Sequence, residues 1–277
     1  MKIVITGARG LIGWHTSVRL HAQNCAARFR SEPAPFDLVL LDHAAFSDQA
    51  YLRDAVAGAG AVLHFAGVNR APDDEVEQAN PAIAGAVVAA CREAGAAPHI
   101  VYANSTHAGR DTPYGRGKHR AGEILATVGG GYTNLILPHI FGEGAQPYYN
   151  NVTATFIDRV IAGEDPSVDP DGKVHLLHAG AAAQEAIDAA LGRKSGEIAP
   201  ASRPTAVPEL LEKIQDFHAA YESNVFPDLR DPFDLALFNS YRAARYPGGF
   251  PRPLKLNTDA RGVLFEAAKG GGGGQTF

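Results

Sequence analysis

Short apolar runs alternate with longer amphipathic stretches along the first two thirds of the chain. The apolar runs have the length of strands, and their continuous hydrophobicity is typical of a buried parallel sheet. We expect these strands at residues 2–6, 37–42, 61–66, 99–104 and 134–138. The stretches between them predict helices at about 11–23, 48–58, 75–94 and 114–128, with irregular chain at 24–36. Strands that alternate with helices imply right-handed βαβ units and a doubly wound, mostly parallel α/β fold.

The pattern changes after Gly142, where residues 143–172 become rich in Gly, Pro, Asn and Asp. The later periodic stretches predict a helix at about 152–162, a strand at 173–177, an alanine-rich helix ending near 191, and helices at about 207–221 and 232–246. We therefore expect a first domain of residues 1–142 with 173–195, and a small mixed C-terminal lobe of residues 143–172 with 196–250. Residues 251–277 have the composition of a tail or flexible linker.

Three glycines follow the first strand at intervals of three: Gly7, Gly10 and Gly13. A strand, a glycine turn and a helix in this order are the context of a dinucleotide-binding fingerprint. Gly7 permits the tight turn, Gly10 lets the backbone approach a pyrophosphate, and Gly13 lets the helix pack closely. The helix N-terminus then offers N–H groups to the phosphates, which predicts a Rossmann-type domain.

Two residues near the glycine turn favour different nicotinamide cofactors. Asp42, at the end of the second strand, favours the free ribose 2′-hydroxyl of NAD(H). Arg9, inside the glycine turn, could bind the 2′-phosphate of NADP(H), with His43 as a second partner. The irregular stretch 24–36 could shift Asp42 out of the ribose pocket. We favour NADP(H), with NAD(H) as the alternative.

Tyr114 and Lys118 lie four residues apart, and therefore on one face of the predicted helix. A nearby ammonium stabilises a phenolate and lowers the pKa of the phenol, so Tyr114 could serve as an acid–base group. Ser105 ends the fourth strand, from which it could hydrogen-bond the same substrate oxygen. Ser105, Tyr114 and Lys118 are therefore the predicted catalytic residues.

Charge and cysteine content narrow the function classes. A net charge of −5 and a pI of about 6.1 give no support to a nucleic-acid partner. The two cysteines have no metal-site or disulfide spacing, and His175 and His178 point to opposite faces of a strand, so we expect no metal. No apolar stretch has the length of a membrane span. A strand that begins at residue 2 leaves no room for a signal peptide, so we expect a cytoplasmic protein.

The motifs TGARGLIG, HFAG and YGRGK, with Ser105 and LPHIFG, resemble those of the extended short-chain dehydrogenase/reductases that act on nucleotide sugars. The match covers about residues 1–190. The stretches HFAGVNR, TPYGRGK and PYYNNVTATF, together with residues 254–277, resemble more closely the reductase domain of the bifunctional capsular-polysaccharide enzyme of UDP-N-acetyl-L-fucosamine synthesis. In that enzyme the reductase domain precedes a cupin, so the resemblance implies a reductase half without its cupin half.

This resemblance implies a set of ligand contacts. For the cofactor they are Gly7, Arg9, Gly10, Leu11, Ile12, Gly13, Asp42, His43, Phe65, Ala66, Gly67, Lys118 and Pro138. For a UDP-sugar substrate they are Asn69, Arg70, Thr106, His139, Tyr149, Asn150 and Val152. The chain departs from the pattern at His139, where asparagine is frequent, at Gly117, where serine is usual, and at 180–182.

The implied reaction is the NAD(P)H-dependent reduction of a UDP-linked 4-keto-6-deoxy-hexosamine for polysaccharide synthesis. Dehydratases of the family carry an Asp-Glu pair after the strand-end Ser or Thr, whereas this chain has Thr106, His107 and Ala108. A UDP-sugar epimerase with tightly bound NAD and a non-catalytic NAD(P)-binding regulator are the alternatives. Relatives pair through two helices of each copy, which implies a homodimer with an alanine-rich interface around 84–86.

Overall fold

The computed structural model describes residues 1–266, 268–270 and 275–276. The chain divides into two compact units, residues 1–138 with 179–202 and residues 139–178 with 203–277. These bounds differ from those drawn from the sequence. Strands β6 (His139–Phe141) and β7 (Lys173–His178) pair with each other, and β7 pairs with β9 (Arg203–Ala206), so they belong to the second unit. Strand β8 (Gly196–Ile198), which the sequence pattern did not predict, pairs with a strand of the first unit.

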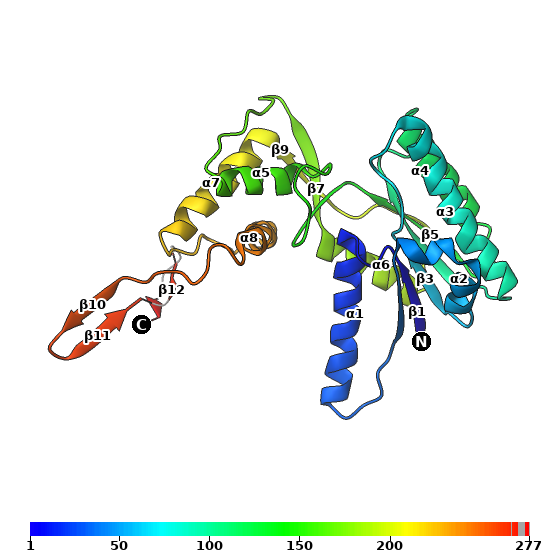
Figure 1. Ribbon diagram of the computed structural model, residues 1–277, viewed down its shortest axis with the longest axis horizontal. Helices are drawn as coiled ribbons and strands as arrows, with labels where there is room; N and C mark the ends of the chain where they lie inside the picture. Colours follow the sequence, from blue (N-terminus) through cyan, green and yellow to red (C-terminus); the bar gives the residue numbers. More distant parts are fainter. Residues whose placement is uncertain (267, 271–274, 277) are drawn as a thin grey trace. The chain divides into compact units, whose positions relative to one another are not determined.

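The first unit is a doubly wound α/β domain, as predicted (Figure 1). Its parallel six-stranded sheet has the order β2-β1-β3-β4-β5-β8. The remaining strands are β1 (Lys2–Thr6), β2 (Asp37–Leu41), β3 (Ala61–His64), β4 (His99–Ser105) and β5 (Tyr132–Leu137). The sheet order changes direction at β1, and in such folds ligands bind at the carboxyl ends of the strands beside this point.

Helices cover both faces of this sheet (Figure 1). They are α1 (Leu11–Phe29), η1 (His43–Ser47), α2 (Gln49–Val56), α3 (Asp73–Glu93), α4 (Pro113–Leu125) and α6 (Ala179–Leu191). Helices α1 and α6 pack together, whereas α3 packs between α2 and α4. The apolar core on the α3 side includes Val4, Val62, Ile100, Val87 and Leu125, all fully buried. Burial from both sides explains why these strands read as continuous apolar runs.

Helix α1 continues through Phe29, so the expectation of irregular chain from residue 24 was wrong. Ala26, Ala27 and Arg28 are good helix formers, and the prolines come only after the helix ends. Asn24 then ties down the returning chain, because its side chain donates to the Phe36 carbonyl at 2.8 Å and accepts from the Phe36 amide at 3.0 Å.

The second unit builds its own core around the sheet β6-β7-β9. Its helices are α5 (Val152–Ile161), α7 (Val207–Glu222) and α8 (Pro232–Arg245). Phe141, Phe217, Phe238, Tyr221 and Tyr241 are buried in this core, with several edge-to-face ring contacts. A mixed sheet with three packed helices therefore forms the small lobe that the sequence pattern predicted.

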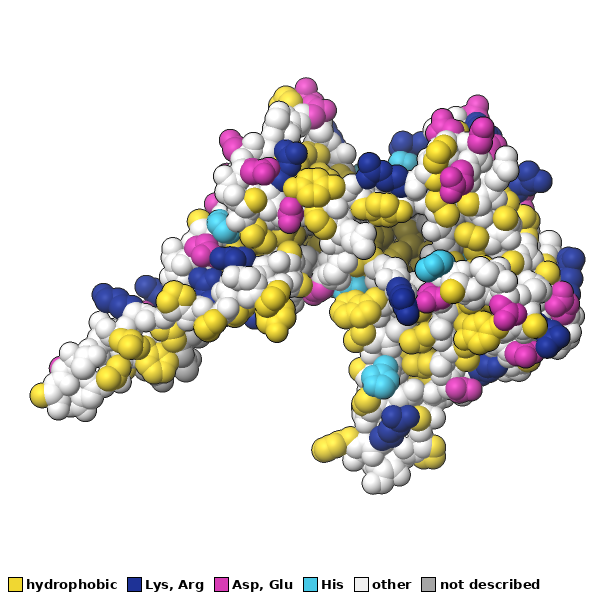
Figure 2. All heavy atoms as spheres, in the orientation of Figure 1, with side chains coloured by type: hydrophobic (Ala, Val, Ile, Leu, Met, Phe, Trp, Pro, Cys, Tyr) yellow, Lys and Arg dark blue, Asp and Glu magenta, His cyan; other side chains and the backbone are white. Residues whose placement is uncertain are grey.

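The tail expected to be a linker contains regular structure. Strands β10 (Leu256–Asp259) and β11 (Gly262–Phe265) form an antiparallel hairpin, and β12 (Ala268–Lys269) pairs with β13 (Gln275–Thr276). Figure 2 shows hydrophobic side chains along this hairpin, where Leu256, Val263 and Leu264 are exposed. The glycine run expected to be flexible falls mostly at 271–274, outside the described residues.

Helices α3 and α4 approach closely at Gly117. A Cβ atom there would lie 2.9 Å from the Glu77 carbonyl oxygen and 3.0 Å from that of Val76. The usual serine of the motif would push the two helices apart, which explains the glycine. Gly85 of α3, by contrast, has nothing within 4 Å of such an atom.

We predict that Gly117→Ser lowers the free energy of unfolding by about 1–3 kcal/mol through overpacking. The matched Gly85→Ala variant should raise it by about 0.5–1 kcal/mol, because alanine favours the helix and meets no neighbour. Urea denaturation followed by circular dichroism measures both changes. Wild-type stability of Gly117→Ser would contradict the close packing.

Candidate active site

The glycine turn after β1 brings three backbone segments into contact. Gly7 has a positive φ of +65°, and a Cβ there would lie 2.7 Å from the Ala66 amide nitrogen. A Cβ on Gly13 would lie 2.2 Å from the Gly7 carbonyl oxygen. Any larger residue would therefore separate helix α1 from the turn, as the fingerprint requires.

Helix α1 begins at this turn with an open N-terminus. Its N-cap is Gly10, so no side chain at this position caps the helix. Leu11, Ile12 and Gly13 provide the first-turn N–H groups, and the helix dipole adds positive charge there. The turn therefore fits the pyrophosphate of a dinucleotide.

Asp42 follows β2 directly beside the glycine turn. Its Oδ1 atom accepts from the Ala44 amide at 3.0 Å and caps η1, which begins at His43. Its Oδ2 atom lies 3.4 Å from Nε of Arg9, whose side chain is 84% exposed. Strand β2 pairs with β1 along its whole length, so residues 24–36 do not displace Asp42, contrary to our expectation. Arg9 and Asp42, which the sequence analysis predicts to favour different cofactors, therefore form an ion pair.

The loop after β3 is held by three polar residues that sequence reasoning missed. Thr6 Oγ1 lies 2.8 Å from His64 Nδ1 and accepts from the Ala66 amide at 3.2 Å. Buried Asn80 accepts from the Val68 amide at 3.1 Å and donates to the Val68 carbonyl at 2.9 Å. These contacts position the predicted cofactor residues 65–67. The sequence carried one signal for these contacts: Thr6 and His64 are polar residues at the carboxyl ends of two otherwise apolar strands that pair with each other.

Ser105, Tyr114 and Lys118 come together at the carboxyl end of β4. Thr112 caps α4, accepting from the Gly115 amide at 3.1 Å, and Pro113 occupies the first turn. Tyr114 is therefore at the start of α4, where the Ser105 side chain hydrogen-bonds it. The structure thus brings the three predicted catalytic residues into one site.

Lys118 is buried beneath this site. Its Nζ atom donates to the Ala103 carbonyl at 2.6 Å and lies 4.2 Å from the centre of the Tyr102 ring. Burial lowers the pKa of Lys118 to about 7, because the charged form loses its hydration. Burial, followed by the positive charge of Lys118, lowers the pKa of His64 to about 3, so His64 is neutral at physiological pH.

The pKa of Tyr114 shifts in the opposite direction to that expected from the sequence. Burial raises it, and the hydrogen bond from Ser105 lowers it less than burial raises it. Burial disfavours the phenolate in the structure as it stands, whereas the sequence argument considered only the neighbouring ammonium. Tyr114 is consequently protonated at neutral pH.

The loop that follows Ser105 carries three further polar side chains near the predicted site, those of Thr106, His107 and Asp111. The His107 amide donates to Ser105 Oγ at 3.1 Å, and the His107 ring contacts that of Tyr114 edge-on. Thr106 donates its amide to the Leu137 carbonyl at 3.0 Å, which ties it to the end of β5 beside Pro138. Asp111, the nearest carboxylate along this loop, accepts from Arg116 at 2.6 Å.

The predicted substrate residues are divided between the units. Asn69 and Arg70 are exposed in the loop that leads from β3 to α3, and Thr106 is exposed after β4. In the second unit, His139 opens β6, whereas Tyr149 and Asn150 lie in an exposed loop before α5.

Val152 is the first residue of α5 and follows the N-cap, Asn151. Asn151 accepts from the Ala154 amide at 3.0 Å and donates to the Ile140 carbonyl at 2.9 Å. It therefore anchors the exposed loop to β6. Asn151 was not among the predicted site residues, although a cap before an apolar run is its ordinary signature.

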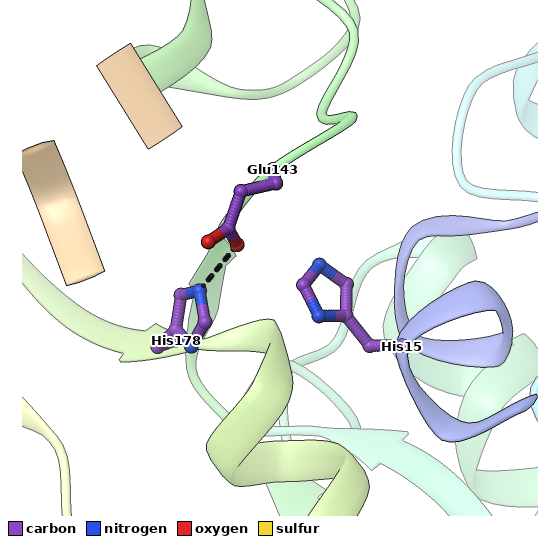
Figure 3. A group of neighbouring side chains, drawn as sticks. All are labelled: His15, Glu143 and His178. Atoms are coloured by element: carbon purple, nitrogen blue, oxygen red, sulfur yellow. Dashed lines mark hydrogen bonds and ion pairs between the residues drawn. The ribbon is translucent and has the colours of Figure 1, made fainter. Parts of the chain in front are cut away.

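His175 and His178 of β7 differ in their surroundings. His178 Nε2 lies 2.8 Å from Oε2 of Glu143, the contact drawn as a dashed line in Figure 3. His175 is exposed on the same strand. His15, also drawn in Figure 3, belongs to helix α1 of the first unit.

The fold and this arrangement define an NAD-dependent enzyme of the extended short-chain dehydrogenase/reductase type. Residues 3–190 match the NAD dependent epimerase/dehydratase family, and the chain belongs to that family. No curated protein matches the sequence. Among the described residues, no helix has the length and apolar character needed to cross a membrane.

Solved structures share the fold. The capsular polysaccharide assembling protein CapF from Staphylococcus aureus is 23% identical, with a TM-score of 0.73 over 97% of this chain and 72% of that one. The Bordetella bronchiseptica enzyme WbmH in complex with NAD+ is 17% identical, with a TM-score of 0.70 over 89% of this chain and 99% of that one. The UDP-N-acetylglucosamine 4-epimerase from Bacillus cereus is 18% identical, with a TM-score of 0.66 over 79% of this chain and 82% of that one.

Lys118 gives a prediction about the pH dependence of stability. Its pKa is about 7 in the folded chain and about 10.5 when unfolded, so the unfolded chain binds more protons between these values. The stability that Lys118 contributes is therefore greatest above pH 10.5 and falls as the pH drops toward 7. Lys118→Met should be more stable than wild type at pH 7, and the difference should shrink toward pH 10.

Thermal unfolding without cofactor across this pH range measures the effect. Lys255→Met, which replaces an exposed lysine, is the control and should follow the wild-type pH dependence. A constant difference between Lys118→Met and wild type at all pH values would contradict the burial of the ammonium.

Proposed function

We propose that this protein reduces a UDP-linked 4-keto-6-deoxy-hexosamine with NAD(P)H. The observation that carries the proposal is the arrangement of Ser105, Tyr114 and Lys118 at the carboxyl end of β4, in the unit that holds the glycine turn. A ketone reduction needs a hydride, a proton donor and a group that orients the carbonyl. The bound cofactor supplies the hydride, and the chain supplies the other two.

Tyr114 is the proposed proton donor. Because burial raises its pKa, it carries its proton at neutral pH, as the reductive direction requires. The Ser105 hydroxyl orients the substrate carbonyl toward Tyr114. Lys118 holds the cofactor through the nicotinamide ribose, and its ammonium stabilises the phenolate that remains after proton transfer. The open N-terminus of α1 holds the pyrophosphate.

The relatives support the substrate class. One is named as a capsular polysaccharide assembling protein and another as a UDP-N-acetylglucosamine 4-epimerase. We propose that Asn69, Arg70 and Thr106 contact the UDP-sugar. The other proposed contacts are His139, Tyr149, Asn150 and Val152.

The position of Asp42 favours a second candidate, a UDP-sugar epimerase with tightly bound NAD. An acidic residue at the end of β2 suits a free 2′-hydroxyl, and Asp42 occupies that position. We nevertheless favour NADP(H), because the Arg9 ion pair offsets the charge of Asp42 and the exposed guanidinium suits a 2′-phosphate. The cofactor that copurifies with the protein distinguishes the two candidates.

A homodimer through α3 and α4 is proposed from the family resemblance. The residues that would form its surface differ from those expected, because Ala84 is fully buried in the core of its own unit. The outer face of the two helices is instead charged. It includes Asp74, Glu77, Arg116, Arg120 and Glu123, which line a broad groove. Charge pairing rather than alanine packing would therefore hold the proposed dimer together.

Tyr114→Phe tests the reaction. Without its proton donor, the enzyme should reduce a UDP-4-keto-6-deoxy-hexosamine at least about 100-fold more slowly, with cofactor affinity nearly unchanged. Tyr241→Phe, which removes a buried hydroxyl from the other unit, should retain wild-type turnover. Stopped-flow oxidation of the reduced cofactor measures both rates. Wild-type turnover in Tyr114→Phe would rule out its assigned role.

Arg9→Ala and Asp42→Ala test the cofactor. Arg9→Ala should weaken the binding of NADPH about tenfold or more, because only NADPH carries the 2′-phosphate. The binding of NADH should be nearly unchanged. Asp42→Ala should change the affinity for NADPH little, because the Arg9 ion pair offsets the charge of Asp42. Fluorescence titration of both cofactors against both variants measures these affinities. Wild type that prefers NADH, together with NAD that copurifies, would favour the epimerase.

A further inference from the structure

We propose that Asn104 is a positioning residue for the reaction, because it holds the backbone of Ser105 through a chain of side chains that ends at Glu197. The inference rests on the proposed reduction, in which the Ser105 hydroxyl orients the substrate carbonyl. Asn104 is 6% exposed and directly precedes Ser105 at the end of β4. It is not among the site residues predicted from the sequence, and its role follows from the way in which the neighbouring strand ends.

Strand β4 extends beyond its neighbour β3 at the catalytic end of the sheet. The last residue of β3 is His64, which lies opposite Tyr102, whereas β4 continues through Ser105. At the other end of β4, the His99 amide donates toward β3, to the Gly60 carbonyl at 3.0 Å. Ser105 follows His99 by an even number of residues, so its amide points to the same side, where β3 has ended. The last backbone groups of β4 on this side therefore need partners other than a strand.

Side chains supply these partners. The Ala103 carbonyl accepts from Lys118 Nζ at 2.6 Å, and the Ser105 amide donates to Asn104 Oδ1 at 2.9 Å. The end of β3 thus frees one acceptor and one donor of β4, which are used to hold the catalytic lysine and the catalytic serine. Asn104 fixes the backbone from which the Ser105 hydroxyl projects.

A chain of hydrogen bonds that crosses two strands orients the Asn104 amide. Its Nδ2 atom donates to Asn134 Oδ1 at 2.9 Å, and Asn134 Nδ2 donates to Glu197 Oε2 at 3.3 Å. Asn134 of β5 and Glu197 of β8 are direct partners in the parallel sheet. The Tyr132 hydroxyl also donates to Asn134 Oδ1, at 3.2 Å. Burial, followed by the charge of Glu197, raises the pKa of Tyr132, so this hydroxyl keeps its proton.

The two ends of the chain fix its direction. The Ser105 amide can only donate, and the Glu197 carboxylate can only accept. Both asparagines must therefore turn their amide nitrogens toward Glu197 and their oxygens toward Ser105. Hydrogen bonds that run in one direction polarise one another, which strengthens the hold on the Ser105 amide. An exposed carboxylate at the edge of the sheet thus selects the orientation in which Asn104 holds Ser105.

Asn104→Ala tests the hold on Ser105. It should lower kcat about tenfold, by the value of one hydrogen bond, and leave the Kd of the reduced cofactor nearly unchanged. Gln184→Ala is the matched control, because it removes an exposed amide of α6 that donates to the Asp188 carboxylate at 2.9 Å, and it should keep the wild-type kcat. Stopped-flow oxidation of the cofactor by a UDP-4-keto-6-deoxy-hexosamine gives kcat, and fluorescence titration gives the Kd. A wild-type kcat for Asn104→Ala would overturn the proposal.

The direction of the chain gives a second test, which a loss of packing does not reproduce. Asn104→Asp still accepts from the Ser105 amide, but its other oxygen faces Asn134 Oδ1, so kcat should again fall about tenfold. Adding Glu197→Gln should restore most of the lost kcat, because Asn134 can then turn over, donate to the new carboxylate and accept from the new glutamine. Glu197→Gln alone should be nearly wild type, since the glutamine oxygen accepts from Asn134. Equal kcat for Asn104→Asp with and without Glu197→Gln would contradict the directed chain.

Amide exchange separates this proposal from the proposed function. In the cofactor-free protein, nuclear magnetic resonance should show the Ser105 amide proton exchanging with solvent about tenfold faster in Asn104→Ala than in wild type. Gln184→Ala should exchange at the wild-type rate. If wild type does not reduce the sugar, the proposed function fails, whereas faster exchange in Asn104→Ala still supports the hold on Ser105. An unchanged exchange rate would overturn that hold whatever the reaction.

Discussion

Burial of the Lys118 ammonium is the constraint on which the catalytic arrangement depends. To place this charge against Ala103 and the Tyr102 ring, helix α4 must approach both β4 and helix α3 closely. Gly115 and Gly117 lie between Tyr114 and Lys118. A Cβ on Gly117 would lie 2.9 Å from the Glu77 carbonyl oxygen of α3, and one on Gly115 would lie 2.3 Å from the Arg110 carbonyl oxygen of the preceding loop, so the two glycines permit this packing. The motif YGRGK thus combines two reactive side chains with the two glycines that allow their burial.

This burial also sets the protonation states around the site. The same loss of hydration that lowers the pKa of Lys118 raises that of Tyr114. His64 is kept neutral, and its hydrogen bond to Thr6 joins the ends of β1 and β3. The site therefore holds a protonated phenol and, one helical turn further along α4, a lysine that can change charge near neutral pH. Such a pair suits proton donation followed by stabilisation of the resulting phenolate.

The predicted cofactor residues Arg9 and Asp42 differ from Lys118, because neither of their charges is fully buried. Arg9 and Asp42 form an ion pair in which Arg9 remains largely in solvent. Exposed pairs contribute little to stability, so either partner can reorganise around a ligand at low cost. The residues proposed to select the cofactor thus meet near the surface, whereas Lys118 of the proposed catalytic set is buried.

The sequence by itself determined the features that short segments encode. Apolar runs between amphipathic stretches predicted the doubly wound sheet, the spacing of Gly7, Gly10 and Gly13 predicted the turn, and the four-residue interval of Tyr114 and Lys118 predicted one helix face. These patterns are local, because strand and helix periods and backbone freedom act within a few residues.

Only the tertiary structure decided what depends on distant neighbours. It extended α1 to Phe29, placed β8 in the first sheet and buried Ala84, since pairing and burial involve segments far apart in the chain. It also reversed the expected direction of the Tyr114 pKa shift. Spacing reveals which charge is near a phenol, whereas hydration of the phenol depends on all the chain packed around it.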